Sequence, residues 1–241
     1  MSESAALAGA RAVITGASSG IGRAAARRLA ALGAEVALVA RRTDVLAREA
    51  AALGPCAVAL PCDLADERAV AALADALQAR WPGGATVLVN SAGLFPLAPV
   101  AETPPELFRA TLDTNLVGPF LLLRALLPSM LARRAGHVVT VGSVADRHVF
   151  PENGAYAASK FGARALHEVL RAELRGSGVR ATLVSPGPVD TPLWDAVDPD
   201  SRPGFTPRAA MLPAEAVAEA IAYVLTQPSR VNVDELRLSA A

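Results

Sequence analysis

Short β-branched segments alternate with longer alanine- and leucine-rich segments along almost the whole chain, and this alternation constrains the fold most. Strands and helices in such alternation are typical of βαβ units, whose strands form a parallel sheet. Several strand segments are apolar throughout, as expected where helices cover both faces of a sheet. The predicted strands are Arg11–Thr15, Glu35–Ala40, Ala57–Pro61, Thr86–Asn90, Val138–Gly142, Val179–Val184 and Val231–Leu238. The predicted helices are Gly20–Leu32, Thr43–Leu53, Asp66–Ala79, Pro105–Arg133, Ala155–Arg175 and Pro213–Thr226.

Two segments depart from this regular pattern. The helix predicted over Pro105–Arg133 should kink at Gly118-Pro119 and at Pro128, and Thr103 is its expected N-cap. Residues 186–212 are rich in Pro, Asp and Ser, which is typical of a lid or a substrate-binding loop. Because no repeat and no linker-like change of composition interrupts the chain, residues 1–241 are predicted to form a single domain.

Charge and composition argue against several classes of function. The 23 basic residues balance 23 acidic ones, a pattern that predicts no binding to nucleic acid or to an anionic membrane surface. The longest uncharged stretch, residues 83–101, contains prolines and polar residues and is not expected to cross a bilayer. Two cysteines are too few for a disulfide scaffold or a zinc cage, and no metal site is expected. Residues 1–4 lack the basic start of a signal peptide, so we expect a cytoplasmic protein.

A glycine-rich turn separates the first predicted strand from the first predicted helix. It reads Thr15-Gly16-Ala17-Ser18-Ser19-Gly20-Ile21-Gly22. Glycine permits a tight turn and a close backbone approach to a pyrophosphate, and the helix N-terminus offers free N–H groups to the phosphates. At the first strand-to-helix junction of such a chain, this turn favours a dinucleotide over the alternative of a tight loop without a ligand.

The end of the second predicted strand indicates which dinucleotide is bound. An acidic residue there would accept from the adenosine ribose hydroxyl, but this strand ends in Ala40-Arg41-Arg42. A planar guanidinium suits a 2′-phosphate, so the sequence favours NADP(H) over NAD(H). The alternative is that both arginines are solvated residues at a helix start. Asp63, after the third strand, is a plausible acceptor for the adenine amino group or the N-cap of the next helix.

Tyr156 and Lys160 form the main catalytic candidate. A spacing of four on a predicted helix places the phenol and the ammonium on one face, and Lys160 is the only lysine of the chain. For a tyrosine to act near pH 7, its pKa must fall by about 3, which is about 4 kcal/mol of phenolate stabilisation. A cation about 4 Å away in an effective dielectric of about 20 supplies about that much. The alternative is a surface pair without a role.

Together these motifs make the chain resemble the short-chain dehydrogenase/reductase family over nearly its whole length. The turn from Thr15 to Gly22 matches the family's T-G-x-x-x-G-I-G pattern. Asn90-Ser91-Ala92-Gly93 matches its N-N-A-G segment, with Ser91 in place of the second asparagine. The other matches are Asn115, Ser143, the Y-x-x-x-K pair, Pro186-Gly187-Pro188-Val189-Asp190-Thr191, and a short tail match at residues 231–236 to members that act on small hydroxy acids.

The resemblance implies a doubly wound Rossmann-like α/β fold with strand order 3-2-1-4-5-6-7 and a catalytic group of four residues. Tyr156 would be the general acid in reduction, and Ser143 would hold the substrate oxygen by a hydrogen bond. Lys160 would lower the pKa of Tyr156 and bind the nicotinamide ribose. Asn115 would anchor a water in a proton relay.

The resemblance also implies the cofactor contacts. Arg41 and Arg42 would bind the 2′-phosphate, Asp63 the adenine and Thr191 the carboxamide side of the nicotinamide. The remaining implied contacts are Gly16, Ser18, Ser19, Gly20, Ile21, Gly22, Leu64, Asn90, Ala92, Gly93, Tyr156, Lys160, Pro186, Gly187 and Val189. Family members usually pair as homodimers or homotetramers through the helices that hold Asn115 and Tyr156.

The expected function is therefore carbonyl–alcohol interconversion by hydride transfer with NADP(H), with reduction of a small ketone, aldehyde or keto acid favoured. One alternative is an NAD-dependent alcohol or hydroxy-acid dehydrogenase of the same family. Arg41 and Arg42 argue against this alternative, because they favour the 2′-phosphate of NADP(H). The other is a non-catalytic dinucleotide-binding redox sensor, which would need no proton donor. Leu94, Phe95, Trp194 and Phe205 either cover an apolar substrate or anchor loops.

Overall fold

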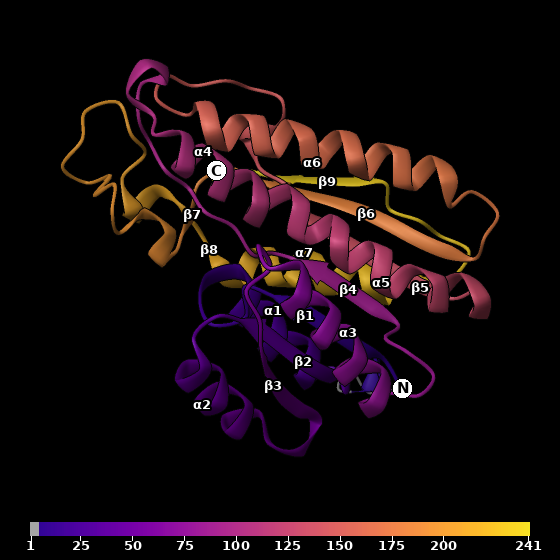
Figure 1. Cartoon of the computed structure of the whole chain (residues 1–241). Coiled ribbons are helices and arrows are strands. Elements are labelled where there is room, and N and C mark those ends of the chain that lie inside the picture. Colours follow the sequence, from indigo (N-terminus) through magenta and orange to yellow (C-terminus); the bar gives the residue numbers. More distant parts are fainter. Residues whose placement is uncertain (1–4) are drawn as a thin grey trace.

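A seven-stranded parallel sheet forms the centre of the computed structural model, which describes residues 5–241 (Figure 1). The strands are hydrogen-bonded in the order β3-β2-β1-β4-β5-β6-β9, and every neighbouring pair is parallel. The predicted Rossmann-like order is thus confirmed, with β9 as the seventh strand. The strands are β1 Arg11–Thr15, β2 Glu35–Ala40, β3 Ala57–Pro61, β4 Val87–Asn90, β5 Gly136–Val141, β6 Val179–Pro186 and β9 Glu235–Leu238. Residues 1–4, on which the expectation about a signal peptide rests, lie outside the described residues.

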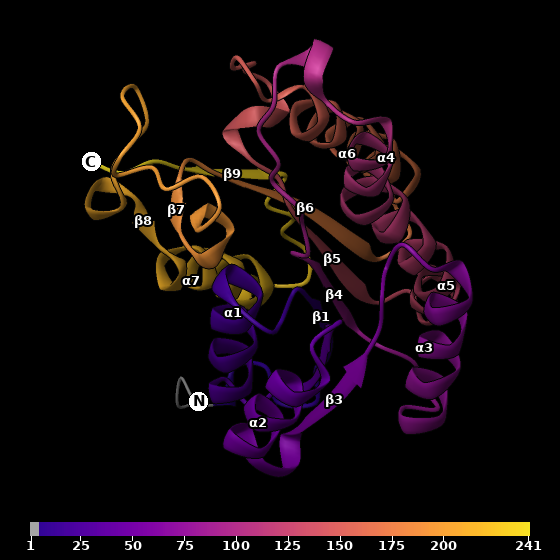
Figure 2. The same cartoon turned by 60° about the vertical axis from the view of Figure 1, so that its left-hand side comes forward.

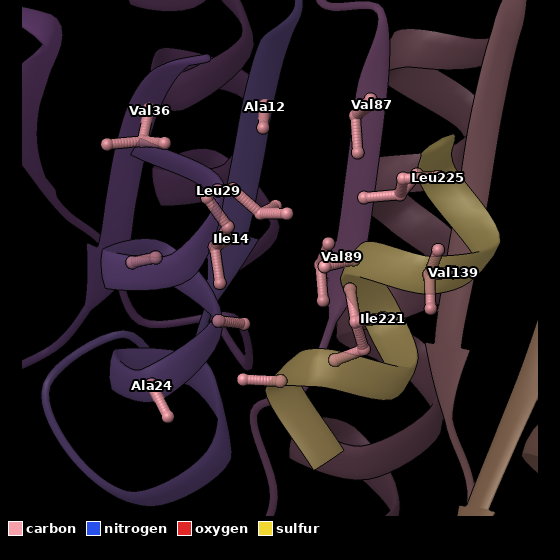
Figure 3. Close-up of a cluster of buried hydrophobic side chains, with 14 of the residues drawn as sticks. Ala12, Ile14, Ala24, Leu29, Val36, Val87, Val89, Val139, Ile221 and Leu225 are labelled. Carbon is pink, nitrogen blue, oxygen red and sulfur yellow. The ribbon is translucent and has the colours of Figure 1, made fainter. Parts of the chain in front are cut away.

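Helices cover both faces of the sheet, and two hydrophobic cores result (Figure 2). Successive β1 side chains alternate between them, since Ile14 belongs to the core under α1 and α7 and Val13 to the core under α3 and α5. In the first core, Ile14 lies beside Leu29, and Ile221 of α7 belongs to the same cluster (Figure 3). The helices are α1 Gly20–Ala31, α2 Thr43–Leu53, α3 Glu67–Arg80, α4 Pro105–Leu112, α5 Gly118–Arg133, α6 Gly154–Glu173 and α7 Ala214–Thr226.

The long helix predicted over residues 105–133 differs from expectation in where it is interrupted. A π-helical turn, Asp113–Val117, separates α4 from α5 just before Gly118-Pro119. The helix continues through Pro128, and the kink expected there stays a prediction. Proline removes the bond to the carbonyl of Arg124, and both residues are exposed, so that carbonyl can meet solvent.

Two predicted helix caps are wrong. Thr103 does not cap α4, whose N-cap is Pro104, because the Thr103 hydroxyl donates instead to the carbonyl of Pro99 at 2.9 Å. Asp63 does not cap α3, because the N-cap is Asp66, whose carboxylate accepts from the Arg68 and Ala69 amides. Asp63 remains available at the end of β3.

One face of the molecule carries exposed apolar side chains. By length and composition alone, residues 105–133 could cross a membrane. In the structure α5 buries Leu122 and Met130 against the sheet but leaves Phe120 46% exposed. Together with α6, which lies beside α4, this stretch forms what we call the outer helical face (Figure 1). Its exposed apolar residues are Phe108, Val117, Phe120, Leu131, Phe161 and Val169.

The predicted substrate loop, residues 186–212, has internal structure. Two short strands, β7 Val189–Asp190 and β8 Leu212–Pro213, pair in parallel and close its base. Arg208 adds ion pairs to Asp190 at 2.8 Å and to Asp195 at 2.6 Å. The loop is therefore held beside the carboxyl ends of the sheet strands, which is where open α/β sheets bind their ligands.

Candidate active site

A cleft of about 820 Å³ opens at the carboxyl ends of the strands, between the glycine-rich turn and the substrate loop. This volume suits a cofactor-sized ligand. Nearly all the predicted site residues line it: Gly16, Ser18, Ser19, Gly20, Ile21, Gly22, Arg41, Arg42, Asp63, Leu64, Ala92, Gly93, Ser143, Tyr156, Lys160, Pro186, Gly187, Val189 and Thr191. The exceptions are Asn90 and Asn115, which line a second cavity of about 20 Å³ that Lys160 also lines.

The glycine-rich turn has the close packing that the sequence predicted. Gly16 and Gly20 have positive φ, at +70° and +50°, where side chains cause strain. A Cβ on Gly22 would lie 2.5 Å from the Gly16 carbonyl oxygen, and one on Gly20 2.9 Å from the Thr191 methyl carbon. The start of α1 thus faces the cleft with unpaired N–H groups and no acidic residue in its first turn, which suits a phosphate.

The segment after β4 is fixed to the same turn through Thr15. The Thr15 hydroxyl oxygen accepts from the amides of Ser91 at 2.9 Å and Ala92 at 3.0 Å. Because these bonds use the backbone, the replacement of the family's second asparagine by Ser91 leaves them intact. A Cβ on Gly16 would be 3.0 Å from Ala92, so the two segments touch.

The end of β2 presents guanidinium groups to the cleft. Arg42 folds back onto the turn, where its Nη2 donates to the Ser18 hydroxyl at 3.0 Å and to the Ser18 carbonyl at 3.2 Å. Arg41 is exposed and has no hydrogen bond or ion pair within residues 5–241. Asp63, further along this edge, accepts from the Ala65 amide at 3.1 Å through one carboxylate oxygen. The part of the cleft beside the ends of β2 and β3 thus offers two cations, Arg41 and Arg42, and one carboxylate, Asp63.

Three of the four predicted catalytic residues meet at the end of β5. Tyr156 is buried on the first turn of α6 and lines the cleft together with Ser143, which lies two residues after the end of β5. Lys160 lies one helical turn further on and is also buried, and its ammonium donates to the carbonyl of Val141 at 2.9 Å. The ammonium is 5.6 Å from the centre of the Tyr156 ring.

Burial controls the protonation of both groups. Burial raises the pKa of Tyr156 to about 12, against a lowering effect from the Ser143 hydrogen bond and a further raising effect from Asp146. Burial also lowers the pKa of Lys160 to about 8, against the opposing effect of Asp146. In this arrangement the Lys160 ammonium bonds to Val141 and desolvation dominates, so the pKa of Tyr156 is raised above its ordinary value. Tyr156 is a protonated donor at neutral pH.

Both side-chain polar atoms of Asn115 are hydrogen-bonded within the protein, and its role in anchoring a water stays a prediction. Its side-chain oxygen accepts from the Leu94 amide at 2.7 Å, and its nitrogen donates to the Leu94 carbonyl and to Ser159, both at 2.9 Å. Ser159 in turn donates to the Tyr156 carbonyl at 2.7 Å. Asn115, in the π-helical turn, therefore braces the start of α6 against the segment after β4.

Polar groups also converge on the small cavity beside Lys160. The side-chain nitrogen and oxygen of Asn90 and the Nε2 atom of His167 are buried without a protein partner among the described residues. All three atoms belong to residues that line this cavity, whose volume of about 20 Å³ suits one water molecule. Asn90 thus contributes to the Lys160 side of the site and not to the main cleft.

Sequence reasoning missed Asp146, which holds Ser143 in place. The Asp146 carboxylate, with no exposed side-chain surface, accepts from the Ser143 amide at 3.2 Å and from the Ser185 hydroxyl at 2.6 Å. The Ser143 oxygen accepts from the Ala145 amide, which completes a capping box over residues 143–146. An acidic residue three positions after a serine is the signal that could have identified it.

Aromatic side chains enclose the end of the cleft beside Tyr156. Phe95 packs edge-on against Tyr156 and against Trp194, with ring centres 4.8 Å apart in each pair. Trp194 contacts Phe205 at 6.3 Å. We call this part of the cleft the substrate end; Leu97, Phe150 and Leu193 also line it. Phe95, Trp194 and Phe205 thus both anchor the loop and line the cleft.

Comparison with known proteins identifies similar chains across this whole site. A family model described as short chain dehydrogenase matches residues 10–202. Glycine betaine reductase ATRR of Emericella nidulans is 40% identical over 236 residues, which are 95% of this chain but 18% of that protein. A metagenomic short-chain oxidoreductase solved in complex with NADP has a TM-score of 0.84 at 33% identity, covering 98% of this chain and 99% of that one. A serine dehydrogenase in its closed form with NADP⁺ has a TM-score of 0.87 at 29% identity, covering 95% and 94%.

Proposed function

The chain belongs to the short-chain dehydrogenase family of oxidoreductases, and we propose that it interconverts a small carbonyl compound and the corresponding alcohol with NADP(H) in the cytoplasm. Reduction of a ketone, aldehyde or keto acid is the favoured direction. The observation that carries this proposal is the buried Tyr156, which lines a cofactor-sized cleft together with Ser143 and Lys160.

The residues of the cleft fit a nicotinamide dinucleotide. The glycines at positions 16, 20 and 22 allow the turn to pack closely against its neighbours, and the N-terminus of α1 faces the cleft where a pyrophosphate would bind. Asp63 and Leu64 would flank the adenine, and Thr191 would approach the nicotinamide end. Two similar structures were solved with NADP or NADP⁺, which supports this assignment. When bound, the cofactor supplies or accepts the hydride.

The chain's own residues handle the proton. Tyr156 holds a proton on its phenolic oxygen at neutral pH and gives it to the carbonyl oxygen of the substrate in reduction. Ser143 donates a hydrogen bond to the same oxygen as negative charge develops there. Lys160, whose pKa near 8 leaves it mostly charged at pH 7, stabilises the phenolate that remains. Asn115 and Ser159 keep the start of α6 in position.

Replacing Tyr156 with phenylalanine tests the reaction. We expect turnover of a panel of small ketones, aldehydes and keto acids, followed through NADPH absorbance, to fall at least ~100-fold because the proton donor is lost. The NADPH dissociation constant should stay unchanged. The control is Tyr223→Phe, at the other tyrosine, which is 54% exposed on α7. Undiminished turnover in Tyr156→Phe contradicts the proposed role.

Preference for NADP(H) rests on Arg41, Arg42 and Ser18. Two guanidiniums and a hydroxyl gather at the edge where a 2′-phosphate would lie, and no carboxylate follows β2 there. Hydrogen bonds to charged groups contribute about 1.5–3 kcal/mol, so Arg41→Ala should raise the NADPH KM about 10- to 100-fold. The NADH KM should not change. An unchanged NADPH KM would favour the NAD-dependent alternative.

We also propose that the protein is a homo-oligomer through the outer helical face. Phe120 and Phe161 are 46% and 42% exposed there, on α5 and α6. A contiguous apolar face of this kind is typical of a protein–protein interface, and a homodimer or homotetramer would cover it. Light scattering coupled to size exclusion should give a multimer, and Phe120→Asp should weaken it. A monomeric wild-type protein contradicts this part of the proposal.

A further inference from the structure

The substrate end of the cleft narrows the class of substrate. We infer that the protein acts on uncharged carbonyl compounds that carry an aromatic or other apolar group, and that it discriminates against substrates with a carboxylate. This inference rests on the proposed function and deepens it. The inference excludes the keto acids named in the proposed function. It also excludes the small hydroxy acids that the short match at residues 231–236 suggested.

The walls of the substrate end are apolar. Phe95 contacts both Tyr156 and Trp194, so any group attached to the reacting carbonyl meets aromatic rings directly beside the proton donor. Phe150 and Leu193 extend this surface from two other segments of the chain. Rings pack favourably against other rings in edge-to-face contacts such as those already present here.

Charged groups at the substrate end are already paired within the protein. Two carboxylates line it, those of Glu152 and Asp195. Arg202 pairs with Glu152 at 2.9 Å, and Arg208 pairs with Asp195 at 2.6 Å. The Arg202 guanidinium also lies 4.9 Å from the centre of the Phe205 ring. Each loop arginine is therefore already engaged with a carboxylate.

The basic side chains that line the cleft lie outside its substrate end. Within residues 5–241, they are Arg41, Arg42 and Lys160. Arg41 and Arg42 are at the glycine-turn end, and the Lys160 ammonium is bonded to Val141 beneath Tyr156. A substrate carboxylate would thus lose water against aromatic walls and paired carboxylates without gaining a counter-ion, which is costly.

A matched pair of aldehydes tests the inference. Methyl 4-formylbenzoate and 4-formylbenzoate share a ring and a reacting group, and they differ in charge far from the carbonyl. We expect kcat/KM for the ester to exceed that for the carboxylate at least ~100-fold, because an unpaired buried charge is strongly disfavoured. A ratio below threefold, or a preference for the carboxylate, overturns the inference and leaves the proposed oxidoreductase function standing.

Two further measurements separate the inference from the proposed function. Calorimetric binding of methyl 4-(hydroxymethyl)benzoate and of 4-(hydroxymethyl)benzoate to the protein with NADPH involves no turnover, because an alcohol and the reduced cofactor cannot react. The ester should bind at least ~30-fold tighter. If it does while no carbonyl compound is reduced, the inference stands and the proposed reaction fails. Equal binding overturns the inference.

The aromatic wall is tested by a single substitution. Trp194→Ala should lower kcat/KM for the aromatic ester at least ~10-fold more than that for acetaldehyde, because only the larger substrate reaches the ring. Tyr223→Ala, on α7 and 54% exposed, is the matched loss of an aromatic ring and should change neither. Equal losses for both substrates in Trp194→Ala overturn the role of the wall.

Discussion

Replacing Asp146 with asparagine should destabilise the protein and disturb Ser143 without affecting the glycine-rich turn. The substitution keeps the shape of a fully buried side chain and removes its charge. In the structure the carboxylate accepts from the Ser143 amide, the Ser185 hydroxyl and, at 2.8 Å, Arg147 Nε. Arg164 adds a longer ion pair at 3.7 Å.

The cost follows from these donors. An amide has one acceptor oxygen in place of two, so one buried donor loses its partner, at about 1–3 kcal/mol. The bond from Arg147 also loses its charge, which removes about 1.5–3 kcal/mol more, and the two effects overlap. We expect the free energy of unfolding to fall by about 3 kcal/mol. For a chain of this length that corresponds to a Tm lower by about 6–12 °C.

Urea denaturation at pH 7 measures the loss, and steady-state kinetics measure the effect on Ser143. kcat should fall about 10-fold or more, because a misplaced Ser143 holds the substrate oxygen poorly, while the NADP⁺ dissociation constant should not change. The control is Asp75→Asn, at an exposed aspartate on α3, which should shift stability by less than about 0.5 kcal/mol. A loss below about 1 kcal/mol at Asp146 would refute the buried network as a stabilising feature.

Three further predictions concern pH and the glycine-rich turn. Burial lowers the pKa of His137 to about 3 and that of His167 to about 4, so between pH 6.5 and these values the unfolded chain binds protons that the folded one does not. The free energy of unfolding should therefore be at its full value at pH 7 and lower by about 2 kcal/mol per histidine at pH 5. In urea titrations, His137→Gln should reduce this loss between pH 7 and pH 5. His148→Gln, at an exposed histidine, should leave the loss unchanged. Gly22→Ala should raise the NADPH dissociation constant at least ~10-fold, measured by fluorescence, because its Cβ would lie 2.5 Å from the Gly16 carbonyl oxygen; wild-type affinity contradicts this reading. Thr15→Val should cost about 2–3 kcal/mol in thermal or urea unfolding, because the amides of Ser91 and Ala92 lose their acceptor, and Thr15→Ser should restore most of it.

Much of the fold was predictable because its signals are local and strong. The strands β1, β2 and β3 begin and end where the sequence predicts, since each apolar run is bounded by turn or charged residues. The positions of Tyr156, Lys160 and the glycine-rich turn followed from spacing alone. Their gathering in one cleft follows from parallel strands, whose carboxyl ends share one edge of the sheet.

The parts that escaped prediction depend on contacts between distant segments. By sequence, the Thr103 hydroxyl oxygen is expected to accept from an amide of the first helical turn, but the N-cap is Pro104, one residue later, and the hydroxyl donates to the carbonyl of Pro99. The pKa of Tyr156 depends on how deeply α6 is covered and on where the Lys160 ammonium points, and neither is visible in a four-residue spacing. The partners of Asn115 lie 21 and 44 residues away.

The short pairing of β7 with β8 has a consequence for how new specificities can arise in this chain. Val189 faces Leu212 and Asp190 faces Pro213, so the loop leaves and rejoins the body of the protein at one place. When the two ends of a loop lie side by side, the loop can be lengthened, shortened or exchanged without changing the strand order of the sheet, as compact surface loops generally can. Residues 192–211 can therefore be exchanged as a unit, and a library of variants confined to them would change the substrate range while the residues assigned to cofactor binding and proton transfer stay the same.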